Sequence, residues 1–138
     1  MYISETKIRV RYAETDRMGY VYYGNYAMYA EVARVEALRQ LDVNYKSMED
    51  NGIILPVLSL NVKYIRPAFY DELLTIKTTI SELPETRMYF KYEIFNEKGE
   101  LLTICSTEHV FVSAANKRPC RAPEWLLVKL KLKIKAEN

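Results

Sequence analysis

The sequence predicts an α+β fold in which one long central helix is wrapped by a curved antiparallel sheet of about five strands. Two observations carry this prediction. Apolar residues recur at helical spacing on more than one face of residues 25–41, which is typical of a helix covered by more than one surface. After residue 52, four alternating or apolar segments are separated by short turns. A sheet that curves around the helix would bury both sets of apolar residues.

The composition is that of an ordinary soluble globular protein, with 138 residues, 49% hydrophobic and 28% charged. We expect one domain, residues 1–138. No apolar run approaches the ~20 residues of a membrane span. The N-terminus lacks the order of a signal peptide, so we expect a cytoplasmic protein. Cys105 and Cys120 are too few for a disulfide framework or a cysteine metal site.

The charge is unevenly placed along the chain. Its net value is +2, and residues 129–138 hold four lysines and one glutamate, which leaves about −1 for the rest. A nearly neutral body argues against a nucleic-acid partner. A small sheet with open edges instead favours self-association, as a dimer and then a tetramer.

The first strand is expected over residues 6–13, where apolar and basic residues alternate. A loop over residues 14–23 leads to the helix at 25–41, and Asn25 is a good N-cap because its side-chain oxygen can accept from first-turn N–H groups. One helix face presents Tyr26, Tyr29, Ala30, Ala33 and Ala37, and a second presents Met28, Val32, Val35 and Leu38. On the wetter side we expect two ion pairs, Glu31 with Arg34 and Glu36 with Arg39.

The remaining strands are expected at 53–66, 72–81, 87–95 and 101–113, joined in sequence as a meander. A short helix is expected after Pro123, which suits the first turn of a helix. Residues 129–135 alternate lysine with leucine or isoleucine. This pattern fits either an edge strand guarded by lysines or a frayed solvated end.

Several kinds of active site are excluded by the residues. Gly19 and Gly24 have P-loop spacing, but the lysine and serine or threonine of that motif are missing. His109 is the only histidine, so a two-histidine zinc site is impossible. Four strand residues separate it from Cys105 by ~13 Å, too far for a dyad. We therefore interpret Cys105 as a packed thiol, and His109 more readily as a satisfied strand residue than as a lone acid or base.

Carboxylates remain, and Asp16 is the best placed. It lies in the loop between the first strand and the helix, three residues before Gly19. It could form an Asx-turn or cap, a frequent use of aspartate in loops. It could also be reactive, because the free N–H groups of a helix N-terminus can hold a developing negative charge. The residues alone favour the first interpretation, and Glu14 and Glu31 are weaker candidates.

Three segments are distinctive. They read Tyr12-Ala-Glu-Thr-Asp16-Arg-Met-Gly19-Tyr-Val21-Tyr-Tyr-Gly-Asn25-Tyr26 followed by Glu31 and Ala33-Arg34, then Val62-Lys-Tyr64-Ile-Arg66-Pro67-Ala68 followed by Asp71, and finally Pro123-Glu-Trp125-Leu. Together they cover nearly the whole chain. They resemble the hot-dog fold acyl-CoA thioesterases of the 4-hydroxybenzoyl-CoA thioesterase type.

The resemblance implies hydrolysis of an acyl-CoA thioester, with Asp16 as nucleophile or as general base for water. Backbone N–H groups around Tyr23 and Gly24 would polarise the thioester carbonyl, and the substrate-binding residues implied are Tyr23, Gly24, Asn25 and Tyr26. The family's site lies at a dimer interface with the nucleotide held by basic side chains, for which the candidates by position are Arg87, Lys117 and Arg118. No metal or organic cofactor is implied, since the CoA thioester is the substrate. In the family, many relatives of the bacterial envelope-associated branch have histidine in place of Tyr23 and other branches have an aromatic residue there, which leaves the acyl preference open.

Two alternatives stay open at this point. A hot-dog dimer could bind an acyl or aromatic ligand without turnover, since five tyrosines fall between residues 20 and 29. A hydratase or dehydratase on the same fold would pair a histidine with a carboxylate, and only His109 is available.

Overall fold

A computed structural model describes residues 1–137, with side chains through residue 134. The strands are β1 (Tyr2–Arg9), β2 (Ile53–Ile54), β3 (Val57–Tyr64), β4 (Leu73–Ile80), β5 (Arg87–Phe95), β6 (Leu101–Val110) and β7 (Val112–Ser113). The helices are α1 (Tyr26–Arg39), α2 (Tyr45–Asp50) and α3 (Glu124–Glu137), with short 3-10 turns η1 (Tyr12–Glu14) and η2 (Tyr23–Asn25). Among residues 1–137, no helix is long and apolar enough to cross a membrane.

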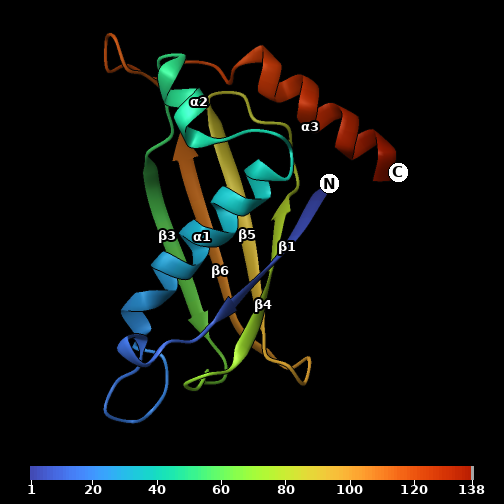
Figure 1. The fold of residues 1–138 in the computed structure, drawn as a ribbon. Helices are drawn as coiled ribbons and strands as arrows, with labels where there is room; N and C mark the ends of the chain where they lie inside the picture. The colour runs from blue at the N-terminus through green and yellow to red at the C-terminus, as the bar shows by residue number, and fades with distance from the viewer. Residues whose placement is uncertain (138) are drawn as a thin grey trace.

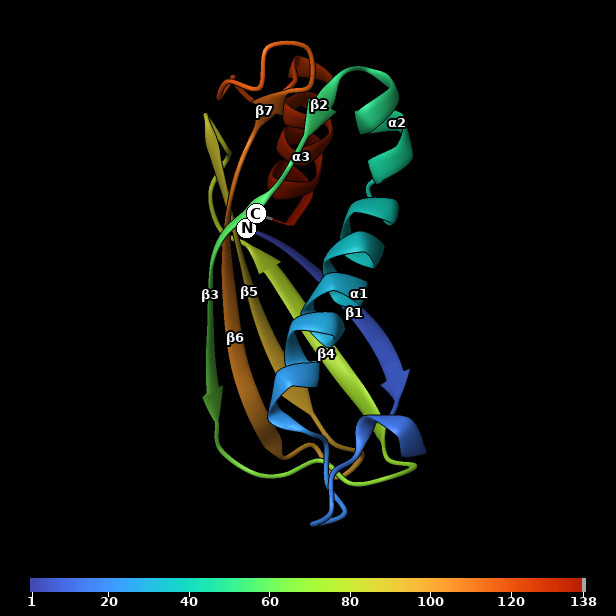
Figure 2. The same cartoon turned by 90° about the vertical axis from the view of Figure 1, so that its left-hand side faces the viewer.

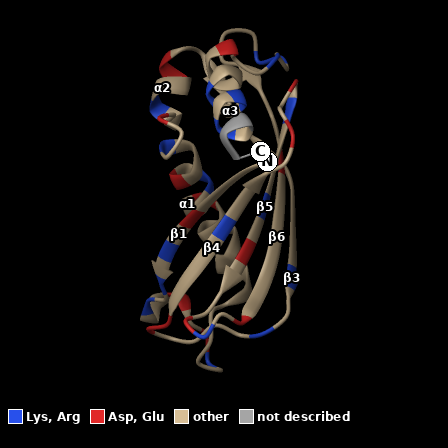
Figure 3. Ribbon diagram, turned by 90° about the vertical axis from the view of Figure 1, so that its right-hand side faces the viewer, with Lys and Arg blue, Asp and Glu red and all other residues tan. Residues whose placement is uncertain are grey.

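Five strands form one antiparallel sheet in the order β1-β4-β5-β6-β3, and β2 pairs with β7 in a small second sheet. Helix α1 lies along one face of the large sheet (Figures 1 and 2). This arrangement confirms the predicted hot-dog architecture. Figure 3 shows acidic and basic residues interspersed over the strands and helices.

The predicted stripe of α1 is its buried face: Tyr26, Tyr29, Ala30, Ala33 and Ala37 are all core residues. Alanines let the helix approach the sheet closely, where it packs on β1, β4 and β5. On the predicted second face Leu38 is fully buried, whereas Met28 and Val32 are 38% and 41% exposed in the single chain.

Several strand predictions need correction. The predicted strands 53–66 and 101–113 are each two strands, β2 with β3 and β6 with β7. The first strand is Tyr2–Arg9 rather than 6–13, because Tyr2 and Ser4 continue its buried face while residues 12–14 turn. The predicted meander holds only for β4, β5 and β6. Strand β3 pairs with β6, so residues 65–72 cross the end of the sheet to reach β4. Alternation of side chains fixes the buried face of a strand, and it does not specify the strand's neighbours.

The lysine-alternating segment is helical, so neither alternative expected for residues 129–135 is correct. Helix α3 runs to Glu137, and its core-facing side chains Leu126, Leu130 and Ile134 are four residues apart. Lysine and leucine are both good helix formers, and two buried leucines fix the helical period.

Arg34 is buried rather than paired with Glu31 on the surface, with only 7% of its area exposed. Its Nε donates to the Tyr45 hydroxyl at 2.9 Å and its Nη1 to the Tyr92 hydroxyl at 3.1 Å. The other predicted ion pair, Glu36 with Arg39, is present.

Candidate active site

Asp16 lies in a tight turn between η1 and η2. Thr15 bridges to Val21, the Asp16 N–H donates to the Tyr20 carbonyl at 2.9 Å, and the Gly19 N–H donates to the Asp16 carbonyl at 3.0 Å. Gly19 has φ of +85°, a conformation that residues with a side chain rarely adopt. One Asp16 carboxylate oxygen accepts the Met18 N–H at 2.8 Å, so the Asx-turn is present. The half-buried carboxylate nevertheless faces a pocket.

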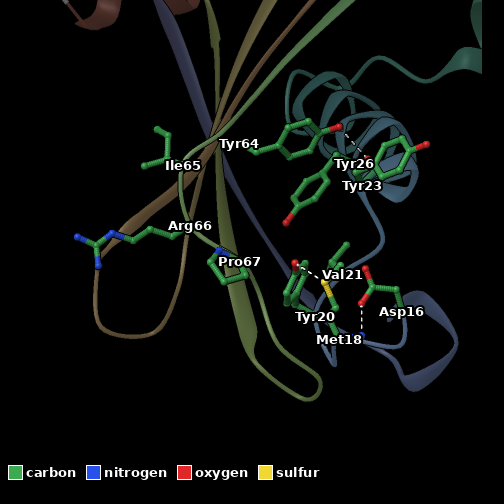
Figure 4. Close-up of a pocket in the computed structure, with 10 residues that line it drawn as sticks. All are labelled: Asp16, Met18, Tyr20, Val21, Tyr23, Tyr26, Tyr64, Ile65, Arg66 and Pro67. Atoms are coloured by element: carbon green, nitrogen blue, oxygen red, sulfur yellow. Dashed lines mark hydrogen bonds between the residues drawn. The ribbon is translucent and has the colours of Figure 1, made fainter.

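The pocket has a volume of about 360 Å³ and is built from two segments distant in the sequence (Figure 4). It is lined by Asp16, Met18, Tyr20, Val21, Tyr23, Tyr26, Tyr64, Ile65, Arg66 and Pro67. Two hydrogen bonds join the segments, from the Val21 N–H to the Ala68 carbonyl at 2.8 Å and from the Tyr64 hydroxyl to the Tyr23 carbonyl at 3.0 Å.

The lining is largely aromatic and apolar. Of its two charged residues, Arg66 points away from Asp16 in Figure 4 and pairs with Glu100 at 2.8 Å. Asp16 is therefore the charged group that faces the four tyrosines of this pocket. Such a cavity suits an apolar or aromatic group presented to one carboxylate.

The start of α1 supplies free donors beside this pocket. Within the described chain, no protein group accepts a hydrogen bond from the N–H of Tyr23 or Gly24, the first two residues of η2. A Cβ on Gly24 would lie 2.8 Å from a ring carbon of Tyr22, so the lack of a side chain lets that ring lie over the backbone. Unpaired N–H groups at a helix start can stabilise an anion.

Asn25 precedes α1 as predicted, but its side chain does not cap the helix. Its Nδ2 instead donates to the Glu14 carbonyl at 2.9 Å. The side chain of Asn25 therefore connects the start of the helix to the preceding loop.

Glu14, a weaker candidate for the reactive carboxylate, is buried, with 5% of its area exposed. Its carboxylate accepts hydrogen bonds from the Arg11 N–H, the Arg11 guanidinium and the Tyr29 hydroxyl. Burial raises the pKa of Glu14. The hydrogen bonds from the Arg11 backbone, from Tyr29 and from the Arg11 side chain together lower it by more, so the pKa lies below its ordinary value. Glu14 is a structural carboxylate.

The three candidates for phosphate contacts lie far from Asp16 in the single chain. Arg87 begins β5 opposite Val110 and pairs with Glu108, whereas Tyr64 lies at the other end of the sheet. Lys117 and Arg118 are exposed on the loop after β7, at the end of the sheet opposite the Asp16 turn (Figure 1). Their role stays a prediction.

His109 and Cys105 do not line this pocket. His109 is fully buried, with Nε2 2.9 Å from the Thr107 hydroxyl and Nδ1 3.2 Å from the Leu55 carbonyl, which confirms a satisfied strand histidine. Burial, and then the charge of Arg34, lower its pKa to about 4. Cys105 is a packed thiol, and burial raises its pKa to about 11. In the described part of the chain, no three histidine, cysteine or acidic side chains gather as a metal site.

The family follows from residues 10–130, which match the thioesterase-like superfamily. The chain belongs to this family. The crystal structure of a DHNA-CoA thioesterase from Staphylococcus aureus is 42% identical with a TM-score of 0.89, over 100% of this chain and 97% of that one. The acyl-CoA thioester hydrolase YbgC of Escherichia coli O6:H1 is 29% identical over 124 residues, 90% of this chain and 92% of that protein. The 1,4-dihydroxy-2-naphthoyl-CoA hydrolase of Thermosynechococcus vestitus is 27% identical over 122 residues, 85% of this chain and 84% of that protein.

The predicted family and enzyme class are thus confirmed, since the thioesterase-like superfamily spans most of the chain. Of the predicted site residues, the structure brings Asp16, Tyr23 and Tyr26 to one pocket and leaves Gly24 and Asn25 outside its lining. The residue patterns did not predict that residues 64–67 form the other side of the pocket. The resemblance of residues 62–68 to a recurrent segment of the family could have indicated it.

Proposed function

We propose that Asp16 is the reactive carboxylate with which this thioesterase-like enzyme hydrolyses an acyl-CoA thioester to the free acid and CoA. The single observation that carries the proposal is that Asp16 shares one pocket with Tyr23 of η2, the turn that leads into α1, and that the N–H groups of Tyr23 and of its neighbour Gly24 have no protein acceptor in residues 1–137. The thioester oxygen gains negative charge as the carbonyl is attacked. Fixed donors at a helix start stabilise that charge without rearranging.

Asp16 can act in either of two ways. As a general base it takes a proton from the attacking water. As a nucleophile it forms an acyl-enzyme anhydride, and water then attacks the acyl carbon so that Asp16 leaves as a carboxylate. In both routes the carbon–sulfur bond breaks, CoA leaves as a thiolate that takes up a proton, and the acid gains one oxygen from water. The tyrosine-lined pocket, together with the names of the Staphylococcus and Thermosynechococcus relatives, favours an aromatic acyl group such as 1,4-dihydroxy-2-naphthoyl.

The test is free-thiol release from aromatic, short, medium and long acyl-CoAs, with wild type, Asp16→Asn and the surface control Asp50→Asn. We expect the highest kcat/KM on an aromatic acyl-CoA, and a fall of about 10²–10⁴-fold in kcat for Asp16→Asn, the usual contribution of a general base. Asp50 lies in an exposed part of α2, so its variant should match wild type. Saturable binding without thiol release would favour the ligand-binding alternative.

We also propose that the enzyme acts as a dimer joined along β3. This strand pairs with β6 on one side only, and its helix-facing residues Leu60 and Tyr64 are 44% and 51% exposed. Met28 and Val32 on α1 are also apolar and partly exposed, at 38% and 41%. In an antiparallel pair of β3 strands, the end of one strand lies beside the start of the other. The Arg87, Lys117 and Arg118 end of the second copy would then lie beside the pocket of the first.

A further inference from the structure

We propose that Glu14 is a positioning residue that fixes the Asp16 turn relative to the start of α1. The proposal rests on the proposed role of Asp16, but it concerns a residue that does not line the pocket. The two parts it joins are the carboxylate turn and the free N–H groups of η2. These come from different elements, so some contact must hold them in register.

The main-chain carbonyl of Glu14 makes the first connection. It accepts the Tyr22 N–H at 2.9 Å and the Asn25 Nδ2 at 2.9 Å. Tyr22 and Asn25 flank Tyr23 and Gly24, the residues with free N–H groups. One carbonyl therefore fixes both sides of the donor pair, two residues before Asp16.

The carboxylate of Glu14 makes the second connection. It accepts the Arg11 N–H at 2.9 Å, the Arg11 Nε at 2.9 Å and the Tyr29 hydroxyl at 2.8 Å. Arg11 precedes η1, and Tyr29 lies one turn into α1. Glu14 is thus tied at once to the segment before the turn and to the helix after it.

The chemistry of the three donors requires a carboxylate. Both Arg11 groups only donate, and the Tyr29 hydroxyl donates to the same buried acceptor. A glutamine amide would turn an N–H toward one of these donors and lose the ion pair with Arg11. An aspartate would be one methylene too short to reach both sides.

Positioning of this kind affects the rate more than substrate binding. Displacement of a reacting group by about 1 Å can lower a rate about 10²-fold even when the substituted residue is outside the site. Loss of the Glu14–Tyr29 contact should therefore lower kcat and leave KM nearly unchanged, because the substrate walls are untouched.

The test is Tyr29→Phe, which removes the hydroxyl and keeps the buried ring in its edge-on contact with Tyr26. The matched control is Tyr2→Phe, which removes another buried hydroxyl, bonded to the Ala37 carbonyl at the far end of α1. We expect Tyr29→Phe to lower kcat on an acyl-CoA about 10- to 100-fold with KM within about twofold. We expect Tyr2→Phe to lose a similar amount of thermal stability while keeping its kcat.

A second readout does not depend on turnover. Amide hydrogen exchange of the Tyr22 N–H should become about tenfold faster in Tyr29→Phe and stay unchanged in Tyr2→Phe, because exchange reports local opening. Unchanged exchange in Tyr29→Phe would overturn the proposal, as would faster exchange with an unchanged kcat. If exchange is faster but Asp16→Asn keeps full activity, the positioning of the turn stands and the proposed catalytic role of Asp16 fails.

Discussion

Buried polar side chains form one hydrogen-bonded row from α1 to the chain before β3. Arg34 can only donate, and it bonds the Tyr92 hydroxyl, which lies 2.8 Å from the Thr107 hydroxyl. Thr107 in turn contacts Nε2 of His109, and Nδ1 of that ring faces the Leu55 carbonyl, which can only accept. With a donor fixed at one end and an acceptor at the other, each hydroxyl donates once toward His109. The row therefore requires a neutral histidine with its proton on Nδ1.

This requirement predicts a loss of stability in mild acid. The pKa of His109 falls from 6.5 to about 4 on folding, so the unfolded chain binds more protons between these values. Stability should fall by about 2 kcal/mol from pH 7 to pH 5 through this residue. Urea unfolding at both pH values would measure it, with His109→Gln as the reference. Equal pH dependence in wild type and variant would contradict the assignment.

At the scale of elements, α3 offers a direct comparison between two leucines two residues apart. Leu130 is fully buried, while Leu132 is 66% exposed. Leu130→Ala should destabilise the protein by about 2–5 kcal/mol because it opens a cavity. Leu132→Ala should change stability by no more than about 0.5 kcal/mol. Denaturant unfolding measures both, and equal losses would indicate that the segment is a strand with both leucines on one face.

The elements differ in how far residues alone could predict them. The period of α1 identified five of its seven buried residues, all except Arg34 and Leu38, and the 87–95 strand has the predicted bounds. Both alternatives for residues 129–135 were wrong because strict alternation is typical of a strand, whereas the side chains that contact the core, Leu126, Leu130 and Ile134, recur every four residues. The pairing of β3 with β6 is a property of the whole sheet, which no local pattern encodes.

At the scale of the molecule, the candidate site was predictable where it is local in sequence. Asp16 and the start of α1 lie within ten residues and form one wall of the pocket. The other wall, residues 64–67, arrives only because residues 65–72 cross the end of the sheet. The burial of Glu14 and Arg34 was also missed. Charged residues in loops and helices are usually exposed, and the tyrosines that bond these two side chains are distant in sequence.

The proposed dimer predicts a difference between two neighbouring positions on β3. Leu60→Glu should convert the dimer to a monomer and lower thiol release, because it places a charge in an apolar interface. Ser59→Glu is the matched control, since Ser59 faces the other side of the sheet with Lys91 and Glu108. Light scattering after size-exclusion chromatography measures the mass of each variant. A dimeric, fully active Leu60→Glu would show that the copies do not meet along this strand.

The central claim, hydrolysis of an acyl-CoA by Asp16, is tested most directly by turnover in H₂¹⁸O, with mass spectrometry of the acid and a thiol assay for CoA. For wild type, the claim predicts one CoA released for each acid formed, with one ¹⁸O in that acid. Folded Asp16→Asn protein should form almost none of either product in the same time. Release of CoA by Asp16→Asn at the wild-type rate, or a product without ¹⁸O, would contradict the claim.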